Sequence, residues 1–145
     1  MIQRIQTVFL IIAIVLVALP LTGLELISYS VKDELVSMNV FSLKFLNKNS
    51  IEPSYFFLMN IFLGLFGFFV TMSYKKLKKQ LNLAKIYIGL ILFVCAMPII
   101  LAIGRSDLNL GIGLYFCLSA IVFVLLAARG ISKDKKLLDS LNRLR

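Results

Sequence analysis

The sequence predicts an all-α membrane protein, a four-helix transmembrane bundle with a small extracytoplasmic β-hairpin between helices 1 and 2. Composition is the first indication: 60% of the 145 residues are hydrophobic and the mean hydropathy is +0.95, whereas soluble domains are about 45–50% apolar. Four long apolar runs are the second indication, and the placement of the sixteen lysines and arginines is the third. We therefore expect one domain, residues 1–145, with lipid as the solvent for most of it.

The four apolar runs cover residues 7–24, 55–74, 83–103 and 110–128, and each approaches the roughly 20 residues that a spanning helix needs. Because backbone amides in hydrocarbon must be paired within their own segment, each run is predicted to be a helix. The first run also has the length of a signal peptide's apolar region. No Ala-x-Ala pattern follows Pro20, so we interpret this run as a retained helix.

The basic residues predict the orientation. Twelve of the sixteen lie at the two chain ends or around the connection between the second and third runs, and four lie on the other side. The positive-inside rule then places both termini in the cytoplasm. A net charge of +9 is also found in nucleic-acid-binding proteins, but the chain has no basic stripe, zinc-ligand spacing or stacking platform, so no nucleic-acid partner is expected.

The outer segment between the first two runs, residues 25–54, is too long for a structureless loop. Residues 24–31 partly alternate and are rich in β-formers, and residues 36–45 follow after a polar turn, a pattern typical of a hairpin. Its apolar face must rest on the helix ends or on a partner, because a lone hairpin is marginal in water. Charged residues near the outer helix ends are interpreted as solvated loop charge rather than a metal or catalytic site: Glu25, Asp33, Glu34, Glu52, Arg105 and Asp107.

The tail, residues 130–145, returns to helical spacing. Leucines fall on one face and basic or polar residues on the other, which predicts a short amphipathic helix on the membrane surface, or alternatively a docking helix for a protein partner. The residues expected to make these contacts are Lys133, Lys136, Leu137, Leu141 and Leu144.

Inside the spans, Asn60 is the most polar side chain, and an interhelical hydrogen bond is favoured over a place in a substrate path. Gly64, Gly67 and Gly89 are expected to let neighbouring helices approach closely. Cys95 and Cys117 are expected to act as small apolar residues, and their spacing leaves open whether they touch.

The residues argue against catalysis. The chain has no histidine, no Gly-rich phosphate loop and no ionisable group in the centre of a span, so no enzyme activity, cofactor or small-molecule substrate is expected. The expected function is an accessory, scaffolding or assembly subunit whose partners are the lipid bilayer and other inner-membrane proteins. The alternative is a small oligomeric channel or carrier, with an enzyme acting on lipid ranked third. A channel would need a polar seam, for which the candidates are Asn60, Thr71, Ser73 and Ser119.

Both ends of the chain resemble a known family. Residues 1–10, MIQRIQTVFL, and residues 131–145, ISKDKKLLDSLNRLR, are similar to a Bacteroidetes family of small four-helix inner-membrane proteins, classed as a domain of unknown function. The resemblance covers the whole chain and implies a bacterial inner membrane and a periplasmic first loop, but no catalytic or binding residues. The layout also looks like the claudin-type four-helix arrangement, an analogy of architecture that conveys no function.

Overall fold

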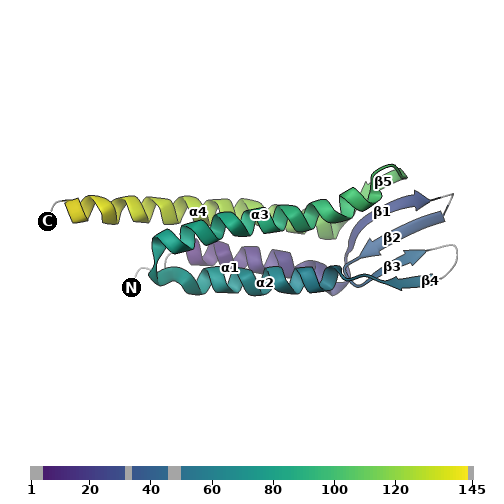
Figure 1. The fold of residues 1–145 in the computed structure, drawn as a ribbon, viewed down its shortest axis with the longest axis horizontal. Helices are drawn as coiled ribbons and strands as arrows, with labels where there is room; N and C mark the ends of the chain where they lie inside the picture. The colour runs from purple at the N-terminus through teal and green to yellow at the C-terminus, as the bar shows by residue number, and fades with distance from the viewer. Residues whose placement is uncertain (1–4, 32–33, 46–49, 144–145) are drawn as a thin grey trace.

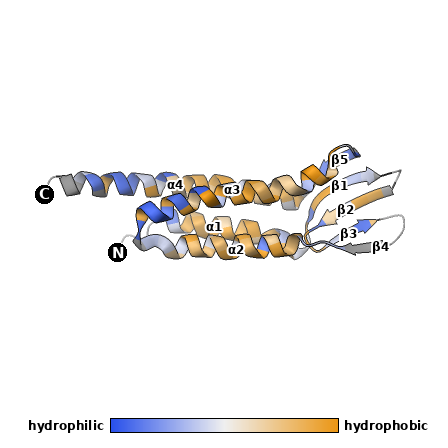
Figure 2. Ribbon diagram, viewed as in Figure 1, coloured by the Kyte–Doolittle hydropathy of each residue, from blue (hydrophilic) through white to orange (hydrophobic). Residues whose placement is uncertain are grey.

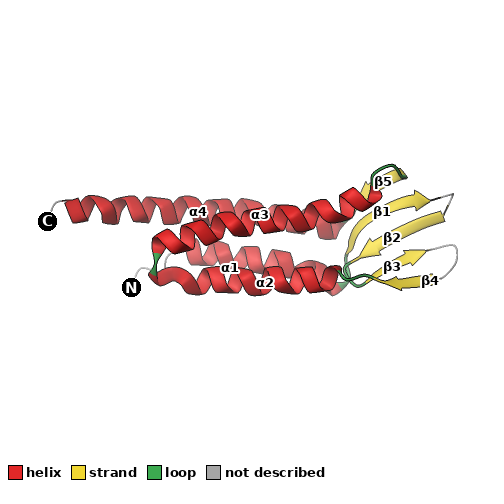
Figure 3. Cartoon of the chain, in the orientation of Figure 1, coloured by secondary structure: helices red, strands yellow, loops and turns green. Residues whose placement is uncertain are grey.

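Four helices lie side by side and a small sheet covers one end of them (Figures 1 and 3). The computed structural model describes residues 5–31, 34–45 and 50–143. Around the bundle, each helix contacts the helix before and after it in sequence, and the last packs back against the first. The helices are α1 (Ile5–Ala18), α2 (Phe56–Met72), α3 (Leu77–Ala102) and α4 (Ile112–Arg143).

The outer surface of the bundle is apolar along most of its length (Figure 2). Leu58, Phe62, Leu65 and Phe69 of α2, for example, are all exposed, and so large an apolar surface is typical of contact with a membrane. Three helical segments are long and apolar enough to cross one: Ile5–Thr22, α3 and α4. The prediction of four apolar helices with a small β element is confirmed. α2 has 17 residues and is shorter than α3 and α4.

The first helix ends earlier than the run 7–24 suggests. α1 gives way to a 3₁₀ turn, Leu19–Thr22, that contains Pro20, whose missing amide N–H removes one hydrogen bond of the α-helix. Gly23 then takes a left-handed conformation, with φ of 89°, and its N–H donates to the carbonyl of Pro20 at 3.1 Å. This glycine turns the chain out of the bundle and into the sheet.

The last two helices, α3 and α4, are longer than their apolar runs. α3 begins at Leu77, so most of the expected basic loop 75–82 is helical, and a 3₁₀ turn at Ser73–Lys75 joins it to α2. α4 continues without a break through the expected boundary at residue 128, so the tail is no separate helix. Polar residues end an apolar run without ending a helix, because lysine has a good helix propensity.

The β element is larger than the predicted hairpin. It contains β1 (Glu25–Val31), β2 (Glu34–Asn39), β3 (Ser42–Phe45), β4 (Ser50–Pro53) and β5 (Ser106–Leu110), in the antiparallel order β4-β3-β2-β1-β5. The predicted strands 24–31 and 36–45 do pair, but the second is divided in two. Ser42 Oγ donates to Asn39 Oδ1 at 3.1 Å across the turn that divides it, and asparagine and serine both favour such turns.

One face of the sheet packs onto the end of the bundle. Ile27, Tyr29, Val36 and Met38 are buried in the same apolar cluster as residues of the helices, including Leu114. The connection between α3 and α4 completes the sheet, since β5 pairs with β1 and the Gly111 N–H donates to the Leu26 carbonyl at 2.8 Å. The apolar face of the predicted hairpin is therefore covered by the protein's own helix ends.

Candidate functional site

The polar side chains within the bundle bond to their own helices. Asn60 is 2% exposed, and its Nδ2 donates to the carbonyl of Phe56, one turn earlier, at 3.2 Å. Its Oδ1 is buried and has no partner among the described residues. Among the described residues, Asn60 therefore bonds within its own helix and not to a neighbouring helix as expected. An asparagine side chain in a helix can reach the carbonyl of the preceding turn.

The other candidates for a polar seam follow the same rule. Thr71, Ser73 and Ser119 each donate to a backbone carbonyl three or four residues earlier, at 3.0, 3.0 and 2.7 Å. A hydroxyl that donates to its own helix backbone has no further proton to donate to a permeating solute.

The three candidate glycines differ in their surroundings. At Gly67, a Cβ would lie 2.7 Å from Tyr87 Oη and 2.8 Å from Ile14 Cγ1, so three helices meet closely there. At Gly64 and Gly89, an added Cβ would meet no atom within 4 Å. Only Gly67 of the three therefore lies at a close helix contact.

Cys95 of α3 and Cys117 of α4 are both buried free thiols. Their side chains are neighbours at the contact between the two helices. This places two of the chain's few polar side chains together at the contact between α3 and α4. Their packing is that of small apolar residues, since both belong to the apolar cluster of the bundle.

Of the six outer charged residues, the structure describes the side chains of Glu25, Arg105 and Asp107. The guanidinium carbon of Arg105 lies 4.7 Å from the ring centroid of Tyr29, and Asp107 accepts a 2.8 Å hydrogen bond from Ser30. Asp33 lies outside the described residues, as do the side chains of Glu34 and Glu52. Among the described residues, no three histidine, cysteine, aspartate or glutamate side chains are grouped so that they could hold a metal ion.

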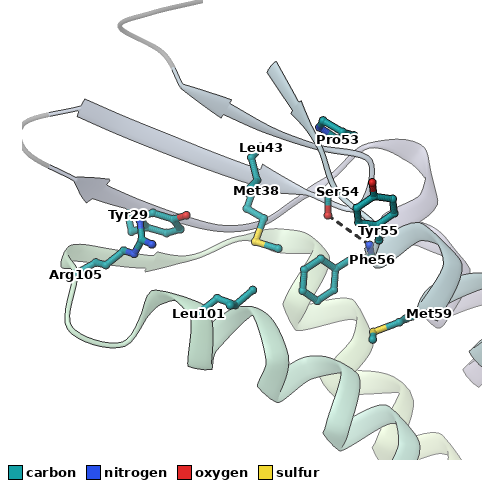
Figure 4. A pocket seen from close by; sticks show the side chains of 10 residues that line it. All are labelled: Tyr29, Met38, Leu43, Pro53, Ser54, Tyr55, Phe56, Met59, Leu101 and Arg105. Atoms are coloured by element: carbon teal, nitrogen blue, oxygen red, sulfur yellow. Dashed lines mark hydrogen bonds between the residues drawn. The ribbon is translucent and has the colours of Figure 1, made fainter. Parts of the chain in front are cut away.

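A cavity of about 310 Å³ lies where the sheet meets the ends of α2 and α3. We call it the sheet-end cavity. Its walls are mainly apolar, with Arg105 and two tyrosines at its rim (Figure 4). The residues that line it are Tyr29, Met38, Leu43, Pro53, Ser54, Tyr55, Phe56, Met59, Leu101 and Arg105.

Sequence reasoning missed this cavity because its walls come from four separate segments. The only local signal is the stretch Pro53–Phe56, one proline followed by a serine and two aromatic residues, which enters α2 directly from β4. There the N–H of Phe56 donates to Ser54 Oγ at 3.4 Å, just before the first turn of α2. The predicted hairpin contained neither β4 nor β5, so no pattern indicated that the sheet would extend over both helix ends.

At the opposite end, the two terminal helices are tied together. Gln6 Nε2 of α1 donates to Asp134 Oδ2 of α4 at 2.6 Å. A Cβ at Gly130 would lie 2.5 Å from Gln6 Cγ, so this glycine provides the room for the glutamine side chain to cross α4. This contact joins residues 128 positions apart, which no sequence spacing reveals.

After Ile131, which is fully buried, α4 contacts α1 once more through Asp134 and then projects past the ends of the other helices (Figure 1). We call residues 132–143 the α4 extension. Lys133 and Lys136 are exposed on it, and the Leu137 side chain is 56% exposed. Of the remaining predicted contact residues, Leu141 belongs to the helix but its side chain lies outside the described part, and Leu144 lies outside the described residues.

Comparison with known proteins agrees with the resemblance at the chain ends. No curated protein matches the chain, and no solved structure matches it either, so the likeness to the claudin-type arrangement remains one of architecture. A family model described as "Domain of unknown function (DUF4293)" matches residues 2–144. Since the match covers nearly the whole chain, this protein belongs to the DUF4293 family.

Proposed function

We propose that this protein crosses the bacterial inner membrane four times and is a non-catalytic accessory, scaffolding or assembly subunit of a larger membrane complex. In this proposal the sheet lies in the periplasm and both termini lie in the cytoplasm. The charge distribution supports the orientation, because the start of α3 and the α4 extension hold most of the lysines. At 17 uncharged residues, α2 falls at the lower end of the roughly 17–25 residues found in spanning helices.

One observation carries the accessory function: the α4 extension continues the line of a membrane-crossing helix. With 32 residues, α4 is about 48 Å long at 1.5 Å per residue, well beyond the roughly 30 Å of a hydrocarbon core. A helix that anchors on a membrane surface lies in the plane of that surface. An extension in line with the span leads away from the bilayer, so its end, past the candidate span Ile112–Leu137, lies beyond the hydrocarbon core.

The leucines of the extension therefore favour a protein partner. Leu137, Leu138, Leu141 and Leu144 recur at the spacing of one helix face, which is the pattern by which an amphipathic helix lies in a partner's groove. The lysines on the opposite face keep that side in water. The bundle thus offers the helix at one end and the sheet at the other as surfaces for other subunits of a complex.

The experiment compares two charge insertions on opposite faces of the α4 extension. Leu137→Glu combined with Leu141→Glu interrupts the leucine stripe, and Ser140→Glu adds charge to the polar face as the matched control. Each protein is purified from its native membrane in mild detergent, and co-purifying membrane proteins are quantified by mass spectrometry. We expect a stoichiometric partner with the unmodified chain and with Ser140→Glu, and its loss with the leucine variant. A lone monomer, or a partner equally retained by all three, contradicts the proposal.

The channel or carrier alternative has less support, because Asn60, Thr71, Ser73 and Ser119 donate to their own helix backbones. An oligomer would have to form its pore between copies, from the apolar outer faces. A liposome flux assay distinguishes the two functions. Solute flux that Asn60→Leu abolishes would favour the channel.

A further inference from the structure

We propose that the sheet-end cavity binds one acyl chain of an anionic phospholipid, with the lipid phosphate held by Arg105. This inference rests on the four membrane crossings proposed above, which place the cavity where acyl chains meet headgroups. It adds a ligand, a ligand class and a binding residue to a surface that the accessory function does not use.

The interior of the cavity suits a hydrocarbon chain. Met38 from β2, Leu43 from β3, Phe56 and Met59 from α2 and Leu101 from α3 surround a common space (Figure 4). Its volume of about 310 Å³ is at the lower end of the roughly 300–1,000 Å³ typical of small-molecule sites. Such a site takes part of one chain rather than a whole lipid, and the remainder of the lipid stays in the bilayer.

The cavity is continuous with the surface that faces lipid. Leu101 is 56% exposed and Met59 is 36% exposed, so the wall between the ends of α2 and α3 is open on the outside of the bundle. An acyl chain can enter sideways from the membrane without passing through water. Tyr55, at the start of α2, is also exposed at the rim, in the position where tyrosine is enriched at membrane interfaces.

The charge at the rim selects an anion. The guanidinium carbon of Arg105 lies over the ring of Tyr29, and the arginine side chain is exposed, so its N–H groups can reach a ligand at the rim. Among the described residues, no carboxylate forms an ion pair with it. The planar fork of an arginine matches phosphate oxygens in a bidentate manner, and a phosphate is the anion that the bilayer supplies at this depth.

The test uses the full chain, purified in mild detergent and mixed with phosphatidylglycerol or phosphatidylcholine that have identical oleoyl chains. Native mass spectrometry measures the fraction of protein with lipid bound. We expect phosphatidylglycerol to bind more tightly, and Arg105→Gln to weaken its binding by about tenfold, as expected for a lost charge-assisted hydrogen bond. Lys44→Gln, which removes another exposed cation from the sheet, is the control and should leave the affinity unchanged.

A second pair of variants tests the apolar part of the site. Leu101→Trp fills the mouth of the cavity and should reduce binding of both lipids, while Ile103→Trp, two residues further along and 73% exposed but outside the cavity, should not. Both positions are exposed, so neither change threatens folding.

Three results would overturn the inference. They are equal affinity for the two lipids, equal effects of Arg105→Gln and Lys44→Gln on the affinity, or a protein that binds free oleate but does not bind phosphatidylglycerol. If no lipid binds while labelling from each side of the membrane still supports four crossings, the lipid site fails and the proposed topology stands.

Discussion

Gly67 occupies the point where α1, α2 and α3 come closest, with Tyr87 Oη and Ile14 Cγ1 both within 3 Å of where a Cβ would be. Gly67→Ala therefore forces neighbouring helices apart, and we expect it to lower the free energy of unfolding by about 1–3 kcal/mol, the usual range for an overpacked core. Gly64→Ala, one turn away on the same helix, meets no atom within 4 Å and should cause no loss. Thermal unfolding of both variants in the same detergent measures the difference. Equal stabilities would show that the three helices do not meet at Gly67.

The hydroxyl of Tyr87 provides a second measurement at the same contact. It is buried and has no hydrogen-bond partner among the described residues, so Tyr87→Phe should not destabilise the protein. Combined with Gly67→Ala, it removes one of the two clashing atoms and leaves Ile14 in place. We expect the double variant to recover part of the lost stability, with a coupling energy of about 0.5–3 kcal/mol. Simple additivity of the two changes would contradict this packing.

Sequence patterns find residues that membrane helices favour at contacts, but they do not show which helix faces which. The glycines at 64, 67 and 89 look equivalent in the sequence, and only the rotation of each helix within the bundle separates the crowded one from the open ones. Asn60 shows the same limit, since periodicity places it inside a span without showing which carbonyl it meets. The side chain is identified from the sequence, and its partner is decided by packing.

At the scale of elements, apolar periodicity predicts helices better than it predicts strand pairing. The helices follow from uncharged runs measured against the bilayer, a physical requirement that acts on each segment alone. The five-stranded sheet depends on contacts between distant segments: β5 is only five residues long and lies some 75 residues after its partner β1. A stretch such as Ser106–Leu110, with polar and apolar residues mixed, becomes a strand because an edge of β1 is available to pair with it.

The pairing of β5 with β1 is open to direct test. Ser28 and Asn109 are register partners, and opposed residues in an antiparallel pair have Cα atoms about 4.5–5.5 Å apart, within the range for a disulfide. In a background with both native cysteines replaced by alanine, Ser28→Cys with Asn109→Cys should form a crosslink under mild oxidation. The shifted pair Ser28→Cys with Leu108→Cys points to opposite faces of the sheet and should not. When the chain is then cleaved between the two cysteines, a crosslinked protein stays in one piece on a non-reducing gel and an uncrosslinked one separates into two fragments. Efficient crosslinking of the shifted pair would show a different register.

At the scale of the whole molecule, the two ends of the bundle differ in chemistry. One end carries a sheet that packs onto the helices through a shared apolar cluster, and the other carries lysines together with the α4 extension. The contact of Gln6 with Asp134 joins the first and last helices at the basic end, while β5 joins the α3–α4 connection to β1 at the sheet end. The bundle is therefore tied at both of its ends by contacts between segments that are far apart in the sequence.

This polarity predicts which surface each end faces. Lys44 on β3 and Lys136 on the α4 extension are both exposed, so each can be changed to cysteine in the background that lacks Cys95 and Cys117. We expect an impermeant maleimide added to intact spheroplasts to label Lys44→Cys at once and Lys136→Cys only after the membrane is permeabilised, because the cluster of lysines and arginines holds the basic end in the cytoplasm. Ile86→Cys, exposed on the apolar surface of α3, should stay unlabelled in both cases. Labelling of Lys136→Cys in intact spheroplasts would show that the basic end lies outside the membrane and the sheet in the cytoplasm, the opposite of the proposed orientation.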